Sequence, residues 1–172
     1  SSNTFFYQVG VGVGSLALKQ AADQLGFQQK TGIEIGWEES LGLVGDERWA
    51  AKGRGWAAPG SVPWIPEDMA SASIGQSVVQ ITPLQLARAY AVFANGGWLV
   101  TPHLAQGTTD WLDADHRRKV AMKPSTLATI RAGLRKVVSA GTGFGLNGPG
   151  IPPAAGKTGT AEDSTGGPDH AW

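Results

Sequence analysis

The segment ITPLQLARAYAVFANGG, residues 81–97, specifies a helix at both of its ends and constrains the fold more than any other stretch. Thr82 is a favourable N-cap, Pro83 suits the first helical position, and Gln85 stands where it completes a capping box. Asn95-Gly96-Gly97 is a natural end, because these residues tolerate the backbone conformation that closes a helix. Apolar residues recur at helical spacing between the two ends: Leu86, Tyr90 and Phe93.

Two more helices and two strands follow from local patterns. SLALKQAADQLG (15–26) has an apolar face and a stop at Gly26, and KPSTLATIRAGLRKVVSAG (123–141) is a third helix. The inward positions of the two helices are Leu16, Leu18, Ala21, Ala22 and Leu25, then Leu127, Ile130, Leu134 and Val138. The polar face of the third helix carries Arg131, Arg135 and Lys136, and these residues are expected only to be solvated. WLVTPHL (98–104) is predicted to form a short strand, and another begins in DHAW at the end of the chain.

The first residues are locally ambiguous. TFFYQVGVGVG (4–14) is rich in aromatic residues and valine, which favour a strand. Asn3 could equally cap a helix that carries one apolar side. That side would consist of Phe5, Phe6, Val9 and Val13.

Two regions lack clear periodicity. Residues 30–66 are rich in glycine and hold four of the seven tryptophans. They are interpreted as a packed surface insertion with aromatic anchors, and a surface that contacts glycan or peptide is the alternative. Residues 107–123 are polar and are expected to form a solvated connection.

Composition narrows the class of protein. A chain of 172 residues is long enough for one domain with a hydrophobic core. Its 14 basic and 14 acidic side chains give no reason to expect a nucleic-acid partner. Cysteine is absent, which excludes disulfides and cysteine-based metal sites. The three histidines, at 103, 116 and 170, lack the spacing of metal ligands, so no metal site is predicted. Both ends look cut, and we expect a window from a longer protein.

AAGKTGTAE (154–162) contains a Gly-Lys-Thr triplet that also occurs at the end of phosphate-binding loops. Such a loop needs a glycine at position 151, which is Ile, and its backbone N–H groups cradle the phosphate. Pro152 and Pro153 have no N–H, and the residues after Lys157 are poor helix formers. The nucleotide-binding interpretation therefore fails.

A strand over Lys157–Thr160 gives a different site. Lys157 would extend a cation toward a cleft, and Thr158 would offer a hydroxyl beside it. Gly159 has no side chain, so a ligand could lie against the backbone as an added strand. The backbone N–H of Thr160 could then stabilise an oxyanion. A Lys-Thr-Gly triplet by itself is more often an ordinary exposed strand, and the decision depends on other motifs.

Three ordered motifs resemble those of one family. Ser-x-Asn at residues 1–3, Ile-Gly-Gln with Thr-Pro-Leu-Gln within residues 74–85, and Lys-Thr-Gly-Thr at residues 157–160 are similar to the transpeptidase domain of class B penicillin-binding proteins. The resemblance extends over essentially the whole chain and includes TGIEIGWEESLGLVG (31–45). It implies the mixed α/β (α+β) fold shared with serine β-lactamases, in which an antiparallel sheet is flanked by a helical subdomain. It also favours a helix over residues 4–12.

The resemblance implies roles for six residues. Ser1 matches the serine of the proton path, Asn3 the amide that contacts the substrate backbone, and Lys157 the cation near that serine. Thr158 matches the hydroxyl that receives the substrate carboxylate, Gly159 the open strand position, and the residue after it, at 160, the oxyanion N–H. The enzymes of the family transfer the acyl group of D-alanyl-D-alanine stem peptides to an amine, bind β-lactams, and need no cofactor.

One departure from the family's pattern stands out, because no Ser-x-x-Lys nucleophile motif occurs in the chain. Residues 1–172 are therefore expected to be a partial transpeptidase domain, mostly helical, with the Lys-Thr-Gly strand but without the upstream nucleophile and the terminal strands. Alone it should be inactive. The parent is expected to be anchored in the membrane with this domain on the extracytoplasmic side, and to meet other proteins of cell-wall synthesis, elongation or division. A non-catalytic β-lactam sensor and a serine β-lactamase relative are the alternatives.

Overall fold

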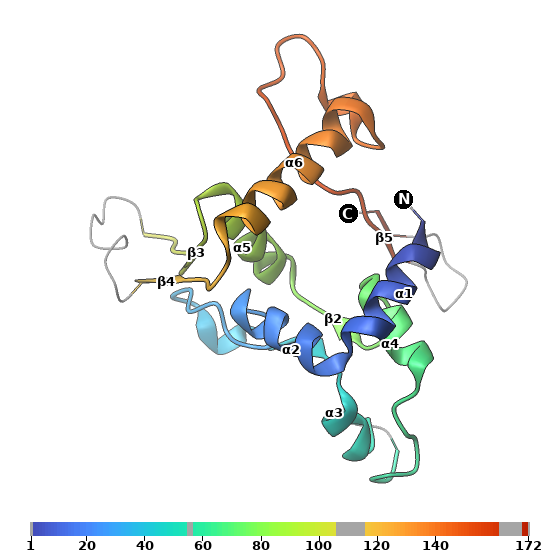
Figure 1. The fold of residues 1–172 in the computed structure, drawn as a ribbon. Coiled ribbons are helices and arrows are strands. Elements are labelled where there is room, and N and C mark those ends of the chain that lie inside the picture. Colours follow the sequence, from blue (N-terminus) through green and yellow to red (C-terminus); the bar gives the residue numbers. More distant parts are fainter. Residues whose placement is uncertain (1, 55–56, 106–115, 162–169, 172) are drawn as a thin grey trace. The chain divides into compact units, whose positions relative to one another are not determined.

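The computed structural model describes residues 2–54, 57–105, 116–161 and 170–171, and the chain divides into two units, Ser1–Ala121 and Met122–Trp172. Helices and short antiparallel strand pairs alternate within it (Figure 1). The first unit contains α1 (Asn3–Val13), α2 (Ser15–Gln24), the 3-10 helix η1 (Gly36–Glu38), β1 (Leu43–Val44), α3 (Glu47–Ala51), α4 (Pro66–Ser73), β2 (Val79–Gln80), α5 (Pro83–Ala94), β3 (Trp98–Val100) and β4 (Arg117–Lys119). The second contains α6 (Pro124–Ala140), the 3-10 helix η4 (Phe144–Leu146), β5 (Thr160–Ala161) and β6 (His170–Ala171).

Residues 3–13 form a helix, so the resemblance predicted this segment better than its local strand propensity did. Ser2 rather than Asn3 is the N-cap, and Asn3 is the first helical residue. The chain turns between α1 and α2 at Gly14, whose φ of +82° is in the region that favours glycine.

Helix α1 packs against α4 (Figure 1), and Gly10 lies at this contact. A Cβ on Gly10 would lie 2.3 Å from Ser73 Cβ, so the two helices approach as closely as glycine allows. The predicted apolar side is not the packed one: Phe5 is 60% exposed, and Phe6, Val9 and Val13 are exposed as well. For helix α2 the prediction is confirmed in part: Ala22 is buried and Leu18 and Leu25 are half-buried as expected, whereas Leu16 and Ala21 are exposed.

The capping box of α5 is confirmed, and its glutamine also binds two distant backbone carbonyls. Thr82 Oγ1 accepts a hydrogen bond from Gln85 N at 3.1 Å, and Thr82 N donates to Gln85 Oε1 at 2.9 Å. Gln85 is only 1% exposed, and its Nε2 also donates to the carbonyls of Gln29 and Leu41, both at 3.0 Å. One amide thus satisfies three backbone groups, two of them 56 and 44 residues away in sequence.

The buried face of α5 lies one position away from the predicted one. Its buried residues are Gln85, Ala89 and Val92, and the predicted Leu86, Tyr90 and Phe93 are half-buried. Leu99 on β3, 1% exposed, belongs to the same core.

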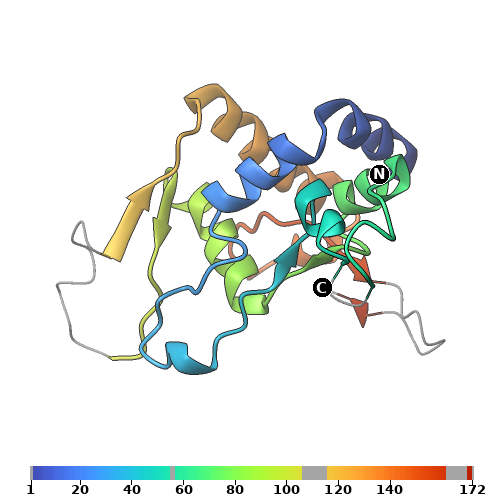
Figure 2. The ribbon, with the colours of Figure 1, turned by 90° about the horizontal axis from the view of Figure 1, so that it is seen from below.

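A basic strand occupies the end of the region expected to be a solvated connection. β4 pairs with β3 so that Trp98 faces Lys119 and Leu99 faces Arg118 (Figure 2). Arg118 Nη2 donates to the carbonyls of Asp23 and Gln24 at the end of α2, and Lys119 Nζ donates to Gly96 O just after α5. Cations at helix C-termini complement the helix dipole, so Arg118 and Lys119 stabilise the ends of α2 and α5. The predicted strand at 98–104 is confirmed over Trp98–Val100.

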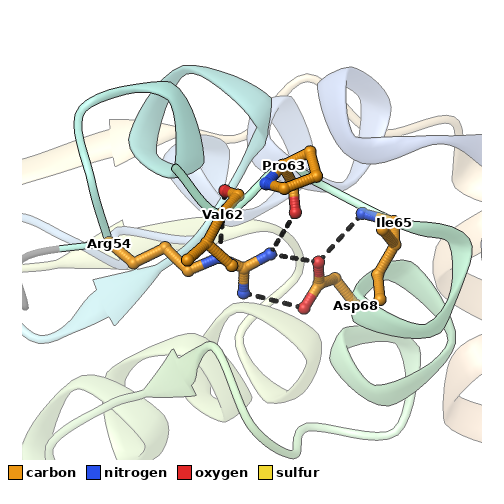
Figure 3. Close-up of polar contacts among 5 residues, drawn as sticks. All are labelled: Arg54, Val62, Pro63, Ile65 and Asp68. Carbon is orange, nitrogen blue, oxygen red and sulfur yellow. Dashed lines mark hydrogen bonds and ion pairs between the residues drawn. The ribbon is translucent and has the colours of Figure 1, made fainter. Parts of the chain in front are cut away.

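An ion pair organises the glycine-rich insertion (Figure 3). Arg54 Nη1 donates to Asp68 Oδ1 at 2.9 Å, Nη2 donates to Oδ2, and both side chains are about nine-tenths buried. Arg54 also donates to the carbonyls of Val62 and Pro63, while Ile65 N donates to Asp68 Oδ2. The bond from Arg54 holds the pKa of the Asp68 carboxyl below its usual value, although burial acts in the opposite direction.

A second carboxylate closes the turn after α2. Glu39 accepts hydrogen bonds from the backbone N–H groups of Thr31 and Gly32 and from the Thr31 hydroxyl. Burial raises the pKa of Glu39, but these hydrogen bonds outweigh it, and the pKa is lowered. The first unit is therefore organised around side chains that satisfy distant backbone groups.

The second unit contains α6, η4 and the segment that leads to the paired strands β5 and β6. Val138 is the buried residue of α6, whereas the other predicted inward positions, Leu127, Ile130 and Leu134, are half-buried. Arg135 does not belong to a purely solvated face, because its Nη1 donates to Ala154 O at 2.7 Å. The prediction that this arginine is only solvated is wrong.

Candidate active site

The segment Ala154–Thr160 carries the Lys-Thr-Gly-Thr residues and is attached to α6 at alternate positions. Arg135 Nη1 donates to Ala154 O at 2.7 Å, and Gly156 N donates to Leu134 O at 3.1 Å. The Thr158 and Thr142 hydroxyls lie 2.9 Å apart. These three contacts fall on residues 154, 156 and 158.

These contacts attach the segment to α6 and to the turn that follows it, just ahead of β5, which begins at Thr160.

The strand predicted over Lys157–Thr160 is confirmed only at its last residue. β5 starts at Thr160 and pairs with β6, so that Thr160 faces Ala171 and Ala161 faces His170. The strand expected at the end of the chain is confirmed by β6. Lys157, Thr158 and Gly159 precede the paired residues and belong to no strand.

Lys157 and Thr158 place hydrogen-bond donors at the surface. Both side chains are exposed, and Lys157 Nζ donates to the carbonyl oxygen of Thr158 at 2.6 Å. An ammonium that bonds an exposed carbonyl can exchange that partner for an anion, because both arrangements are open to solvent. A cation and a hydroxyl on neighbouring residues are a suitable donor set for a carboxylate.

Ser1 and Asn3 belong to the first unit. Ser1 lies outside the described residues, and Asn3 is exposed in the first turn of α1. Lys157 belongs to the second unit, so the convergence of the Ser-x-Asn residues with Lys157 on one cleft stays a prediction.

Sequence reasoning missed two residues that hold the candidate site, Thr142 and Arg135. The Gly-Thr-Gly sequence after α6 is a helix-ending signal that could have indicated a tight turn at 141–143. Nothing in the local sequence indicated that the turn meets Thr158, because 16 residues separate the two threonines. Arg135 gave no signal, since a basic residue on a polar helix face is normally solvated.

Comparison with known proteins identifies the family. The model of the penicillin binding protein transpeptidase domain matches residues 1–172, and the chain belongs to this family. The sequence-based recognition of a class B penicillin-binding protein is thereby confirmed, as is its fold.

Relatives and solved structures agree with this assignment. The chain is 34% identical over 168 residues to the peptidoglycan D,D-transpeptidase MrdA of Acinetobacter baumannii, covering 94% of this chain and 24% of the relative. It is 30% identical to the stage V sporulation protein D of Bacillus subtilis, with the same two coverages. The structure of a complex between PBP2 and MreC from Helicobacter pylori matches with a TM-score of 0.81 and 26% identity, over 99% of this chain and 30% of that one.

A structure described as a peptidoglycan synthase complex that coordinates polymerization and crosslinking matches with a TM-score of 0.75 and 33% identity. That match covers 95% of this chain and 27% of the other. The chain thus spans about a quarter of the length of the curated relatives that it matches over most of its own length.

Proposed function

We propose that this chain is part of a peptidoglycan D,D-transpeptidase that cross-links the cell wall by acyl transfer from D-alanyl-D-alanine stem peptides. The observation that carries the proposal is the family match over residues 1–172, together with Lys157 and Thr158 exposed side by side on a segment fixed to α6. Two of the relatives are named peptidoglycan D,D-transpeptidase MrdA, which supports this reaction. A sensor or a β-lactamase has no comparable support here.

In the proposed reaction a serine oxygen bonds to the carbonyl carbon of the penultimate D-alanine. The peptide C–N bond breaks, and the serine proton passes to the departing amine of the terminal D-alanine. An amine of a second stem peptide then attacks the ester, the C–O bond breaks, and the serine recovers a proton. The nucleophile belongs to a Ser-x-x-Lys motif that we place upstream of Ser1 in the parent protein.

Roles for the residues of this chain follow the resemblance. Lys157 and Thr158 bind the carboxylate of the terminal D-alanine, and Ser1 takes part in proton transfer together with Lys157. Asn3 holds the substrate backbone. Gly159 leaves room for the substrate strand, and the N–H of the next residue stabilises the oxyanion.

We further propose that the parent is anchored in the membrane with this domain on the extracytoplasmic side, where its substrate lies. None of the helices in the described residues has the length and apolar character that crossing a membrane would require. The partners are other proteins of cell-wall synthesis, in keeping with the PBP2–MreC complex and the synthase complex among the matching structures.

The test is acylation of the full-length parent by fluorescent penicillin. We expect a covalent adduct in the wild type and about a hundredfold slower acylation in Lys157→Ala, because a preorganised charge at the reacting centre is removed. Lys136→Ala is the matched control, since Lys136 is exposed on α6 outside the segment. A wild-type parent that forms no adduct would contradict the proposal.

A second measurement separates the enzyme from a sensor. The wild-type parent should release D-alanine from a D-alanyl-D-alanine peptide and transfer the acyl group to an added amine. An adduct with penicillin without any release of D-alanine would instead identify a β-lactam sensor.

A further inference from the structure

The turn that ends α6 presents a hydroxyl to the candidate substrate-binding threonine. Thr142 Oγ1 lies 2.9 Å from Thr158 Oγ1, and either oxygen can be the donor of this hydrogen bond. Both residues belong to the second unit.

The position of Thr142 is fixed by the backbone on either side of it. Gly141 N and Gly143 N both donate to Val137 O, at 3.2 and 3.0 Å, and Phe144 N donates to Gly141 O at 3.1 Å as η4 begins. A Cβ on Gly141 would lie 3.0 Å from Val137 O, so the turn is closed tightly against the last turn of α6.

The position of Thr158 is fixed by the same helix. Arg135 and Leu134 hold residues 154 and 156, which lie four and two positions before Thr158. The two hydroxyls are therefore brought together by attachments to the same helix and the turn that ends it.

We propose that Thr142 is a positioning residue that directs the hydroxyl proton of Thr158 toward the substrate carboxylate. The inference rests on the proposed function. An ionised carboxylate only accepts hydrogen bonds, and a threonine hydroxyl has one proton. When Thr158 donates that proton to the carboxylate, its lone pair is free to accept from Thr142. Thr142 thus becomes the donor of the pair, and it holds the Thr158 hydroxyl in the orientation that binds the anion.

The direction of the two bonds also predicts cooperation between them. Chains of hydrogen bonds polarise one another, so a hydroxyl that accepts from Thr142 is a better donor to the carboxylate. Substrates or inhibitors that lack a negative charge at this position gain little from the arrangement. Thr142 should therefore increase discrimination in favour of anionic ligands rather than raise reactivity in general.

The experiment measures acylation of the full-length parent by a penicillin and by the methyl ester of the same penicillin. Thr142→Val replaces the hydroxyl by a methyl group, and we expect acylation by the carboxylate form to fall about tenfold while the ester changes little. Thr142→Ser keeps the hydroxyl and should stay near the wild type. Thr129→Val is the matched control, because the exposed Thr129 hydroxyl donates to Ser125 O within α6.

The outcomes are distinguishable. An equal fall with acid and ester, or a lowered thermal midpoint that accounts for the loss, would show a structural role only and overturn the inference. If the wild type is acylated and Thr142→Val is acylated by the carboxylate form equally fast, the inference about Thr142 is overturned while the proposed function stands. Absence of any adduct in the wild-type parent would remove the proposed function and this inference together.

Discussion

The two units of the chain use polar side chains in different places. In Ser1–Ala121, Gln85 and the Arg54–Asp68 pair are buried and make several hydrogen bonds each. In Met122–Trp172, the hydrogen bonds that hold residues 154–158 come from half-buried and exposed groups on α6 and its C-terminal turn. A hydrogen bond is stronger in a low-dielectric interior, and an unpaired group costs more there.

The difference teaches where this chain tolerates change. Substitutions at the buried polar groups of the first unit should damage folding, because each leaves several partners unsatisfied. Substitutions around the Lys-Thr-Gly segment should cost little stability and should act mainly on binding. The predictions below test that contrast.

The largest effect is expected for Asp68→Ala. It leaves the Arg54 guanidinium buried without its carboxylate, which costs about 3–5 kcal/mol in comparable buried pairs. Urea unfolding followed by tryptophan fluorescence measures the change in the free energy of unfolding. Glu67→Ala, at an exposed neighbouring position of α4, is the control. Equal stability of the two variants would show that the ion pair does not organise the insertion.

Gln85→Glu should be the next most destabilising substitution. The carboxylate keeps the shape of the amide but cannot donate to the carbonyls of Gln29 and Leu41. We expect a loss of about 3 kcal/mol, since two part-buried acceptors lose their donor and a charge is placed at a buried position. The exposed Gln20→Glu is the control for the charge change. A loss of unfolding free energy no larger than that of Gln20→Glu would show that the hydrogen bonds of Gln85 to Gln29 and Leu41 do not stabilise the start of α5.

Replacing the two glycines of α1 by alanine should change the stability of the protein in opposite directions. Gly10→Ala places a Cβ 2.3 Å from Ser73 Cβ and should destabilise the protein by about 1–3 kcal/mol through overpacking. At Gly12 no atom lies within 4 Å of an added Cβ, so Gly12→Ala should stabilise the helix by up to about 1 kcal/mol. Thermal unfolding of the two variants measures both. The same sign for both would mean that α1 does not pack on α4 through Gly10.

Acid should weaken the first unit through Asp68. Its folded pKa lies below the unfolded value, so its stabilising contribution is complete above the unfolded pKa, near 4, and is lost as the pH falls through the folded pKa. The stability difference between the wild type and Asp68→Asn should therefore shrink in that acidic window. Urea titrations at several pH values measure it. A difference that stays constant down to the lowest pH would contradict the depressed pKa.

The smallest effect is expected in the second unit. Gly133 lies in the middle of α6 and is exposed, and nothing lies within 4 Å of an added Cβ. Gly133→Ala should stabilise the helix by about 0.5–1 kcal/mol by restricting the unfolded chain. Hydrogen exchange of the α6 amides measures it. Because α6 holds residues 154–158, the Gly156 amide should gain protection as well; no change at that amide would argue against the attachment.

The sequence predicted much of the candidate site but not its geometry. The motif residues and the family were identified from the sequence, and the family is confirmed. Their placement just ahead of a two-residue strand, on a segment held by Arg135 and Thr142, came from the structure. The convergence of Ser1 and Asn3 with Lys157 is still a prediction.

The sequence by itself determined the features whose partners lie within one helical turn. The capping box of Thr82 and Gln85 and the end of α5 at Asn95 belong to this kind. Their signals are local, so a short stretch of residues contains both partners of each bond.

Tertiary structure alone decided which residues of α1 and α5 are buried and which distant groups come into contact. It turned Gly10 rather than Phe5 toward α4, joined Gln85 to Gln29, and paired Arg54 with Asp68. It also overrode the strand propensity of residues 4–12. The physical reason is that burial and hydrogen-bond satisfaction are properties of the packed molecule, and local backbone preferences are weak beside them.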